Sequence, residues 1–161
     1  MILYHGSLER ITTPKIREPN RTLDYGAGFY ATTAYTQAEE WVRRRMKESF
    51  ASIGYVNEYV LKTELLEQMH CLFFTSPTEE WLDFVMRNRT ERGFTHNFDV
   101  VYGPVANDRV YAAFALYEGG LLNKQNLIAE LRTYKLVDQY LFHTPRALEA
   151  ISFIKAKQIA L

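Results

Sequence analysis

Two glycines that precede a short aromatic run limit the folds open to this chain more than any other feature. Gly26 and Gly28 come just before Phe29 and Tyr30, and β-favouring residues continue to about residue 33. A dinucleotide-binding fold of the Rossmann kind needs a third glycine and the start of a helix here, whereas this segment continues as a strand. Glycines fit poorly inside a regular strand, so the pair predicts a bend or a close backbone approach.

Helical and strand patterns alternate along the chain without an internal repeat. Helices are predicted at residues 37–47, 77–92, 109–117, 123–133 and 145–154, with start signals at Thr36, at Ser76-Pro77-Thr78 and at Thr144-Pro145. Strands are predicted at residues 2–4, 28–33, 55–65, 99–104, 139–142 and 158–161. Few regular crossover helices join these short strands. The pattern favours one compact α+β domain over residues 1–161, with a split, mainly antiparallel sheet flanked by helices, over a doubly wound parallel sheet.

Charge and composition argue against a membrane or a metal as a partner, and a nucleic-acid partner would need a local basic patch. Lys+Arg and Asp+Glu both number 19, so no net charge draws the protein to nucleic acid or to an anionic membrane. The single cysteine, Cys71, provides neither a disulfide framework nor a cysteine-rich metal site, and His70 and His96 lack partners at metal-ligand spacing. No apolar stretch approaches the roughly 20 residues of a membrane span. We therefore expect a cytoplasmic protein that binds no metal and no membrane.

The N-terminal strand and the strand at residues 28–33 contain the parts of a compact pocket for nicotinamide and its ribose. Gly6 lets backbone groups approach a ligand because it has no Cβ, and the neighbouring His5 and Ser7 supply hydrogen bonds for ribose or amide oxygens. Tyr30 offers an aromatic ring, and strand alternation places it on the face opposite Phe29. An ordinary turn beside a core tyrosine is the alternative interpretation.

These segments resemble the first two motifs of the ADP-ribosyltransferase superfamily, on its diphtheria-toxin and poly(ADP-ribose) polymerase side, which is recognised by a His-Tyr-Glu triad. Within it the chain is most similar to a small uncharacterised bacterial family, domain of unknown function 3990. The resemblance implies mono-ADP-ribosylation with NAD as the substrate, an unidentified protein or nucleic-acid acceptor, and the role of a toxin paired with an antitoxin protein. It is carried by Asp24-Tyr25-Gly26-x-Gly28-Phe29-Tyr30-x-Thr32, Gln37-Ala38-x-x-Trp41, Gly103-Pro104-Val105-Ala106-Asn107-Asp108 and Gln139-Tyr140-x-Phe142-His143-Thr144.

The third triad position departs from the superfamily, because Gln139 stands where a Glu opens the late strand. A neutral amide can hydrogen-bond to the ribose but cannot stabilise the positive charge that forms as the glycosidic bond breaks. The resemblance thus implies His5, Tyr30 and Gln139 as the catalytic set, without chain elongation. Asp108 is a candidate for a carboxylate from elsewhere, with helix capping as the alternative. The NAD-binding set expected from chemistry and resemblance is His5, Gly6, Ser7, Gly28, Phe29, Tyr30, Thr32 and Asp108.

Two functions of other classes stay open. The neutral Gln139 fits a catalytically weak module that binds NAD or ADP-ribose. An aromatic surface that includes Trp81 fits a non-enzymatic protein-interaction domain. Transfer of radioactive label from NAD distinguishes an enzyme from the binding module. Growth of a host that expresses the chain distinguishes a toxin from the protein-interaction domain.

Overall fold

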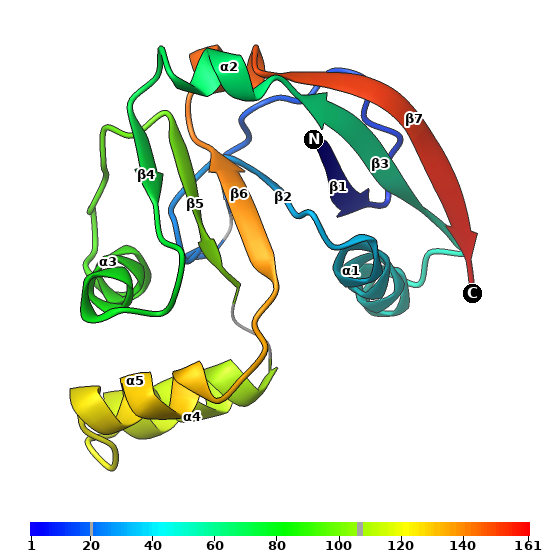
Figure 1. Ribbon diagram of the computed structural model, residues 1–161. Coiled ribbons are helices and arrows are strands. Elements are labelled where there is room, and N and C mark those ends of the chain that lie inside the picture. The colour runs from blue at the N-terminus through cyan, green and yellow to red at the C-terminus, as the bar shows by residue number, and fades with distance from the viewer. Residues whose placement is uncertain (20, 106–107) are drawn as a thin grey trace.

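The computed structural model describes residues 1–19, 21–105 and 108–161, apart from the side chain of Asp108. In this part of the chain, no helix is long and apolar enough to cross a membrane. The elements follow one another as β1 (Ile2–Ser7), β2 (Phe29–Ala31), α1 (Tyr35–Glu48), β3 (Ile53–Leu61), α2 (Thr63–Leu66), β4 (Cys71–Phe73), α3 (Glu79–Thr90), β5 (Val100–Pro104), α4 (Asp108–Glu118), α5 (Lys124–Arg132), β6 (Asp138–Phe142), α6 (Pro145–Leu148) and β7 (Ile151–Ala160) (Figure 1).

The strands form two separate sheets, which Figure 1 shows side by side. One sheet has the order β1-β3-β7, and the other has the order β2-β6-β5-β4. Within them β4 and β5 run parallel, with α3 in the connection, and the other neighbouring pairs are antiparallel. The predicted α+β fold with a split, mainly antiparallel sheet is confirmed.

The two sheets meet where β1 passes the end of β2. Tyr4 and Thr32 form an isolated antiparallel bridge there, with backbone hydrogen bonds of 2.8 Å and 2.9 Å in the two directions. Beyond the bridge the chain turns into α1, whose buried side chains pack against β3 and β7. The strand that carries His5 therefore lies beside the strand that carries Tyr30.

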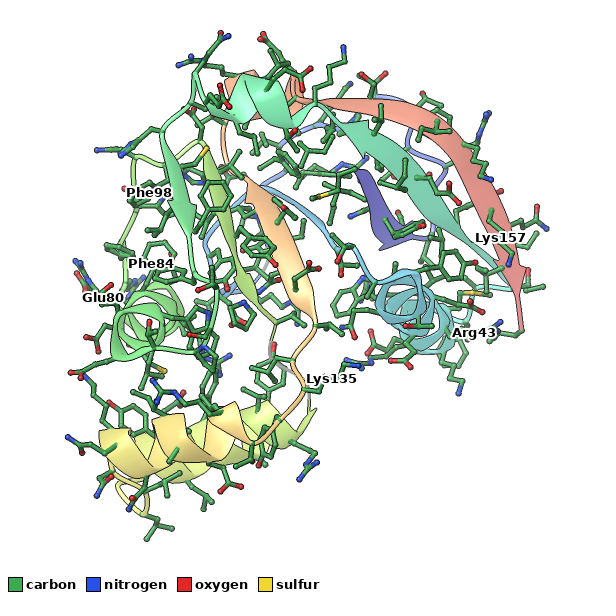
Figure 2. The ribbon with its side chains drawn as sticks, viewed as in Figure 1. Arg43, Glu80, Phe84, Phe98, Lys135 and Lys157 are labelled. Atoms are coloured by element: carbon green, nitrogen blue, oxygen red, sulfur yellow. The ribbon has the colours of Figure 1, made fainter. Side chains whose placement is uncertain are left out.

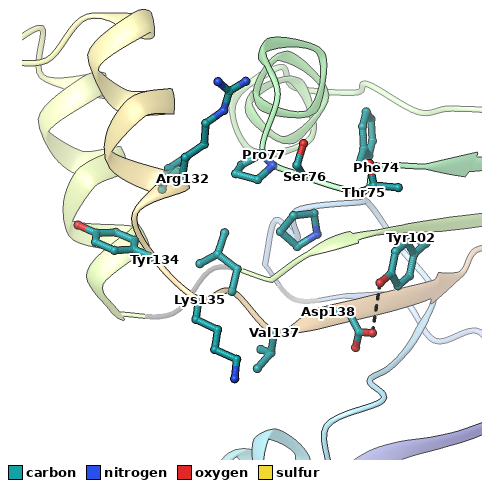
Figure 3. Close-up of a pocket in the computed structure, with 13 residues that line it drawn as sticks. Phe74, Thr75, Ser76, Pro77, Tyr102, Arg132, Tyr134, Lys135, Val137 and Asp138 are labelled. Carbon is teal, nitrogen blue, oxygen red and sulfur yellow. Dashed lines mark hydrogen bonds between the residues drawn. The ribbon is translucent and has the colours of Figure 1, made fainter.

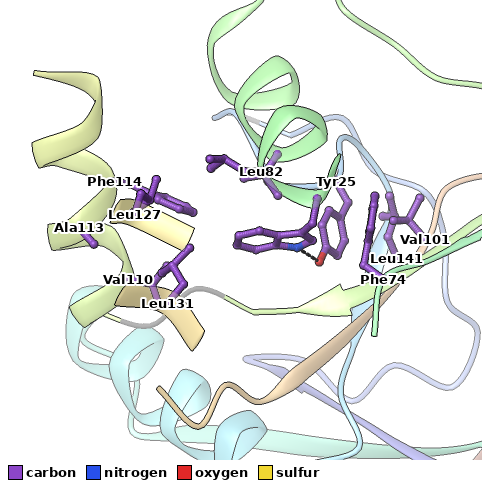
Figure 4. Packing of buried hydrophobic residues seen from close by; sticks show 12 residues of the cluster. Tyr25, Phe74, Leu82, Val101, Val110, Ala113, Phe114, Leu127, Leu131 and Leu141 are labelled. Carbon is purple, nitrogen blue, oxygen red and sulfur yellow. Dashed lines mark hydrogen bonds between the residues drawn. The ribbon is translucent and has the colours of Figure 1, made fainter. Parts of the chain in front are cut away.

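The sheet that contains β2 and β6 buries both of its faces. Val101 and Leu141 pack on one face against α3, α4 and α5 (Figure 4). Phe29 and Phe142 pack on the other face, in a cluster that includes Tyr59 of the second sheet. Alternate residues of β2 and β6 consequently lie in different surroundings, one between the sheets and the other under the helices.

The prediction of a helix over residues 145–154 is wrong, because the helix there is short and a strand follows it. The Oγ1 atom of Thr144 does accept a hydrogen bond from the Ala147 amide at 3.1 Å, but α6 ends at Leu148. Ile151 then begins β7, which pairs along the whole length of β3 and absorbs the strand predicted at residues 158–161. Pairing with a long neighbour thus outweighs the local helix signal.

Two other helix starts differ from prediction. α1 begins at Tyr35 with Ala34 at its N-cap, and no side chain caps it, so the expected capping box at Thr36 is absent. α3 is capped by Thr78 rather than Ser76, because the Thr78 Oγ1 accepts from the Trp81 amide at 3.2 Å. The strand expected at residues 55–65 ends at Leu61, where α2 takes over.

Candidate functional site

His5 lies on β1 and contacts β2 through both its ring face and its ring nitrogen. The ring stacks on Phe29 with 4.3 Å between centroids, and Nδ1 lies 2.5 Å from the backbone carbonyl of Tyr30. A carbonyl can only accept, so Nδ1 carries the proton and Nε2 is left as an acceptor. Burial lowers the pKa of His5 to about 4, with Arg17 adding to the effect and the Tyr30 hydrogen bond opposing it. His5 is therefore a neutral imidazole near pH 7.

Tyr30 directs its side chain away from His5. Its neighbours Phe29 and Ala31 pack between the sheets, whereas Tyr30 packs against the cluster under the helices. The Tyr30 hydroxyl donates to the Gly26 carbonyl at 2.5 Å and accepts from the Tyr25 amide at 3.2 Å. Burial raises the pKa of this phenol well above its ordinary value, so it stays protonated. His5 and Tyr30 are thus adjacent through the backbone and not ring to ring.

Gln139 lies one strand away, on β6, and shares the face of Tyr30. Tyr30 pairs with Leu141, and alternation along β6 returns Gln139 to that same face. Gln139 is only 9% exposed, and its Nε2 has no hydrogen-bond partner among the described residues. A buried amide nitrogen without a partner costs about 1–3 kcal/mol. This atom therefore has an unused hydrogen-bond donor, which is shielded from solvent in this structure.

A buried tyrosine and tryptophan, which sequence reasoning did not place in the site, connect Tyr30 with Gln139. The Tyr25 hydroxyl donates to the Pro104 carbonyl at 2.8 Å and accepts from the Trp81 indole Nε1–H at 2.8 Å (Figure 4). Burial raises the Tyr25 pKa far above the ordinary value, an effect that the Trp81 and Gln139 side chains oppose. The Gln139 amide thus faces the Tyr25 hydroxyl without forming a well-directed hydrogen bond. The sequence could have suggested this contact, because the hydroxyl of a buried tyrosine and the indole N–H of a buried tryptophan usually have hydrogen-bond partners.

The glycines of the expected NAD-binding set are required by packing within the protein. A Cβ on Gly6 would lie 2.4 Å from the Ala38 carbonyl of α1, and a Cβ on Gly28 would lie 2.4 Å from the Phe142 carbonyl of β6. The backbones pass too closely at both places for any other residue. Ser7, from the same set, accepts a hydrogen bond from the Glu9 amide at 3.1 Å.

Thr32 contacts the carboxylate of Asp138, a residue that sequence reasoning did not place in the site. Its Oγ1 donates to Asp138 at 3.1 Å, and the next residue, Thr33, donates to the same carboxylate from its amide at 2.9 Å and its hydroxyl at 2.6 Å. The Tyr102 hydroxyl adds a contact at 3.3 Å. Asp138 thereby ties β5 and β6 to the connection between β2 and α1. Asp108 is the first residue of α4, and its side chain lies outside the described residues.

A cavity of about 370 Å³ opens beside Asp138 (Figure 3). This volume is within the range of small-ligand pockets. Its lining does not include His5, Tyr30 or Gln139, and it combines two cations with hydroxyl and apolar groups. The lining consists of Phe74, Thr75, Ser76, Pro77, Tyr102, Pro104, Leu131, Arg132, Tyr134, Lys135, Leu136, Val137 and Asp138. No group of three or more His, Cys, Asp or Glu residues in the described part is placed to hold a metal ion.

Comparison with known proteins identifies a family but no activity. The family model described as Protein of unknown function (DUF3990) matches residues 1–153, which is almost the whole chain. A search of curated proteins gives no match. The chain therefore belongs to the DUF3990 family.

Proposed function

We propose that this member of the DUF3990 family is an NAD-dependent mono-ADP-ribosyltransferase. The observation that carries the proposal is the meeting of β1, β2 and β6, which brings His5, Tyr30 and Gln139 onto neighbouring strands. These are the strands on which the resemblance to ADP-ribosyltransferases puts a triad. The neutral His5 ring and the unpartnered Gln139 amide support the proposal because both can bind ribose hydroxyls.

In the proposed reaction, the bond between the nicotinamide nitrogen and ribose C1′ breaks, and its electron pair leaves with nicotinamide. The acceptor nucleophile then bonds to C1′ and gives its proton to solvent. The His5 Nε2 accepts from a ribose hydroxyl on the face of the sheet that carries Phe29, and the Gln139 Nε2 donates to an oxygen of the dinucleotide on the opposite face, where this amide is covered in the present structure. Neither group carries charge, so the site stabilises the cationic sugar less than a carboxylate would. This favours single transfers over chain elongation.

Isothermal titration calorimetry with NAD tests the binding step. The wild-type protein should bind NAD, and His5→Ala and Gln139→Ala should each weaken binding by about tenfold, the effect of one hydrogen bond to an otherwise unpaired group. His70→Ala is the matched control, because the His70 ring contacts the Phe98 ring, at 4.5 Å between centroids, and the Asn97 carbonyl, at 3.1 Å, and none of the proposed site residues. A wild-type protein that binds no NAD would overturn the proposal.

Label transfer from radioactive NAD tests the chemistry. Gln139→Glu restores the carboxylate of the superfamily triad and should raise the rate of transfer or of NAD hydrolysis above that of the wild type. Gln139→Ala should lower it. Equal rates in all three proteins would remove Gln139 from the proposed catalytic set.

The neutral Gln139 also favours a second candidate, a module that binds NAD or an ADP-ribosylated partner without turnover. NAD binding without any label transfer would support this candidate against the enzyme. The wider proposal of a cytoplasmic toxin held in check by an antitoxin predicts that expression slows bacterial growth. His5→Ala should abolish that effect, and normal growth of cells that express the wild-type chain at high level would contradict the toxin role.

A further inference from the structure

Two histidines from distant segments stack on each other beside the loop that precedes β2. His96 lies between α3 and β5, and His143 directly follows β6. Their ring centroids are 4.1 Å apart, with 35° between the planes. Phe84 and Phe98 flank the His96 ring at 5.3 Å and 5.6 Å, and Figure 2 labels both phenylalanines. The proposed transfer reaction does not use either histidine.

Each imidazole binds a backbone carbonyl of the same loop. The His96 Nε2 lies 2.8 Å from the Tyr25 carbonyl, and the His143 Nδ1 lies 2.6 Å from the Ala27 carbonyl. The carbonyl between them, that of Gly26, accepts from the Tyr30 hydroxyl. Three consecutive carbonyls are thus held by three side chains, one of which belongs to the proposed site.

The loop is also anchored at its first residue. Tyr25 is fully buried, and its hydroxyl contacts Trp81 and Pro104. Gly26 has a φ of +88°, a region that favours glycine, and its amide donates to the Leu23 carbonyl at 3.2 Å. The histidine contacts add to this anchor on the carbonyl side of the loop.

We propose that His96 and His143 are positioning residues that hold residues 25–27, and with them Tyr30, in the binding conformation, and that this hold weakens when His96 gains a proton. This inference rests on the proposed function where it concerns NAD. It makes the affinity of the site fall in mildly acidic solution. Below neutrality the loop loosens, although the rest of the fold persists.

The hydrogen bonds of His96 explain the dependence on charge. Its Nδ1 accepts from the Phe98 amide at 3.2 Å, and its Nε2 donates to Tyr25, so both nitrogens are occupied in the neutral ring. A proton on Nδ1 removes that acceptor and places a charge against the His143 ring. Burial lowers the pKa of His96, and His143 lowers it further, so the change falls below the ordinary value of about 6.5.

Other charged groups around the pair are engaged with partners of their own. On the loop side, Asp24 forms an ion pair with Arg89 of α3 at 3.4 Å. On the side of β5 and β6, Asp99 accepts from the Thr144 hydroxyl at 2.7 Å and from the His70 amide at 3.0 Å. An electrostatic effect of His143 also lowers the pKa of His96. Protonation of His96 therefore has no free carboxylate to compensate it among the described contacts.

Amide hydrogen exchange of residues 24–30 between pH 8 and pH 5 tests the positioning role without any ligand. The wild-type protection factors, corrected for intrinsic rates, should fall about tenfold, which corresponds to roughly one pKa unit of coupling. His96→Gln keeps a donor toward the loop carbonyl but cannot titrate, so its protection should change little with pH. His143→Asn also keeps a donor and removes the ring that a charge on His96 would face, so its protection should fall less with pH than that of the wild type. His70→Asn, on a neighbouring histidine, should follow the wild type. Wild-type protection that does not change, or variants that keep the wild-type fall, would overturn the inference.

Calorimetry with NAD on the same proteins at pH 8 and pH 5 tests the link to the site. The wild-type dissociation constant should be several-fold higher at pH 5, whereas that of His96→Gln should be nearly the same at both values. Equal pH dependence in the two proteins would contradict the link. A wild type that binds no NAD even at pH 8 removes the proposed function and the link together, while the exchange result still decides whether the pair positions the loop. Far-UV circular dichroism checks that each variant is folded.

Discussion

Removal of one buried hydroxyl, in Tyr25→Phe, tests how strongly the helix side of the core depends on a polar contact. The change keeps the ring but leaves the Trp81 indole N–H and the Pro104 carbonyl without partners, both in buried positions. Each orphaned group costs about 1–3 kcal/mol, partly offset because the hydroxyl no longer has to be desolvated. We expect a loss of about 3 kcal/mol in the free energy of unfolding and a Tm lower by about 6–12 °C.

Urea unfolding followed by circular dichroism measures this loss, and the Trp81 indole N–H resonance reports the broken contact directly. Tyr59→Phe is the matched control, since Tyr59 is equally buried but its hydroxyl makes one hydrogen bond, to the Ile11 carbonyl at 2.6 Å. Ile11 is only half-buried, so water can replace the hydroxyl and the expected loss is about 1 kcal/mol. Losses of equal size in the two variants would refute the reasoning.

Three further variants or conditions follow from the contacts at the crossing of the sheets. Gly28→Ala should lower the free energy of unfolding in urea by about 1–3 kcal/mol, because its Cβ would collide with the Phe142 carbonyl, and an unchanged midpoint would contradict this. Asp138→Asn should increase hydrogen exchange at the Thr33 amide and lower the free energy of unfolding by about 1–2 kcal/mol. Unchanged exchange would contradict a stabilising role for the Asp138 carboxylate. The folded pKa of His5 is depressed to about 4, so the unfolded chain takes up the proton first and stability falls as pH drops from about 6.5 toward 4. Denaturant titrations of the wild type and His5→Gln should differ by up to about 3 kcal/mol in this pH dependence, and parallel curves would refute the assignment.

Local sequence patterns predicted a helix or strand correctly where the residues that form the pattern also pack into the core or cap the helix. The alternation at Phe29 and Tyr30 puts the two rings on opposite faces, as expected, and the structure packs Phe29 between the sheets and Tyr30 under the helices. α5 begins behind Asn123, whose side chain accepts from the Asn126 amide at 2.8 Å, at the predicted start. In these cases the same residues satisfy both the local backbone and the core.

Prediction failed where pairing between distant segments decides the outcome. The Thr144-Pro145 start is real, but the β-favouring residues from Ile151 onward find a long partner in β3 that the sequence alone does not reveal. The contacts of Tyr25 depend on residues 56 and 79 positions away, Trp81 and Pro104. Local periodicity contains no information on such pairs, so the polar connection between Tyr30 and Gln139 required the structure.

The position of β3 between β1 and β7 also sets the order in which the protein can assemble during synthesis. β1 can pair with β3 once residue 61 has been made, but the other edge of β3 finds its partner only when Ile151–Ala160 is complete. Until then, a nine-residue strand presents unpaired backbone groups, which is the kind of edge that promotes aggregation of nascent chains. Chains that stop before β7 should therefore be the species that most need chaperones, even though the strands that carry His5 and Tyr30 are already present.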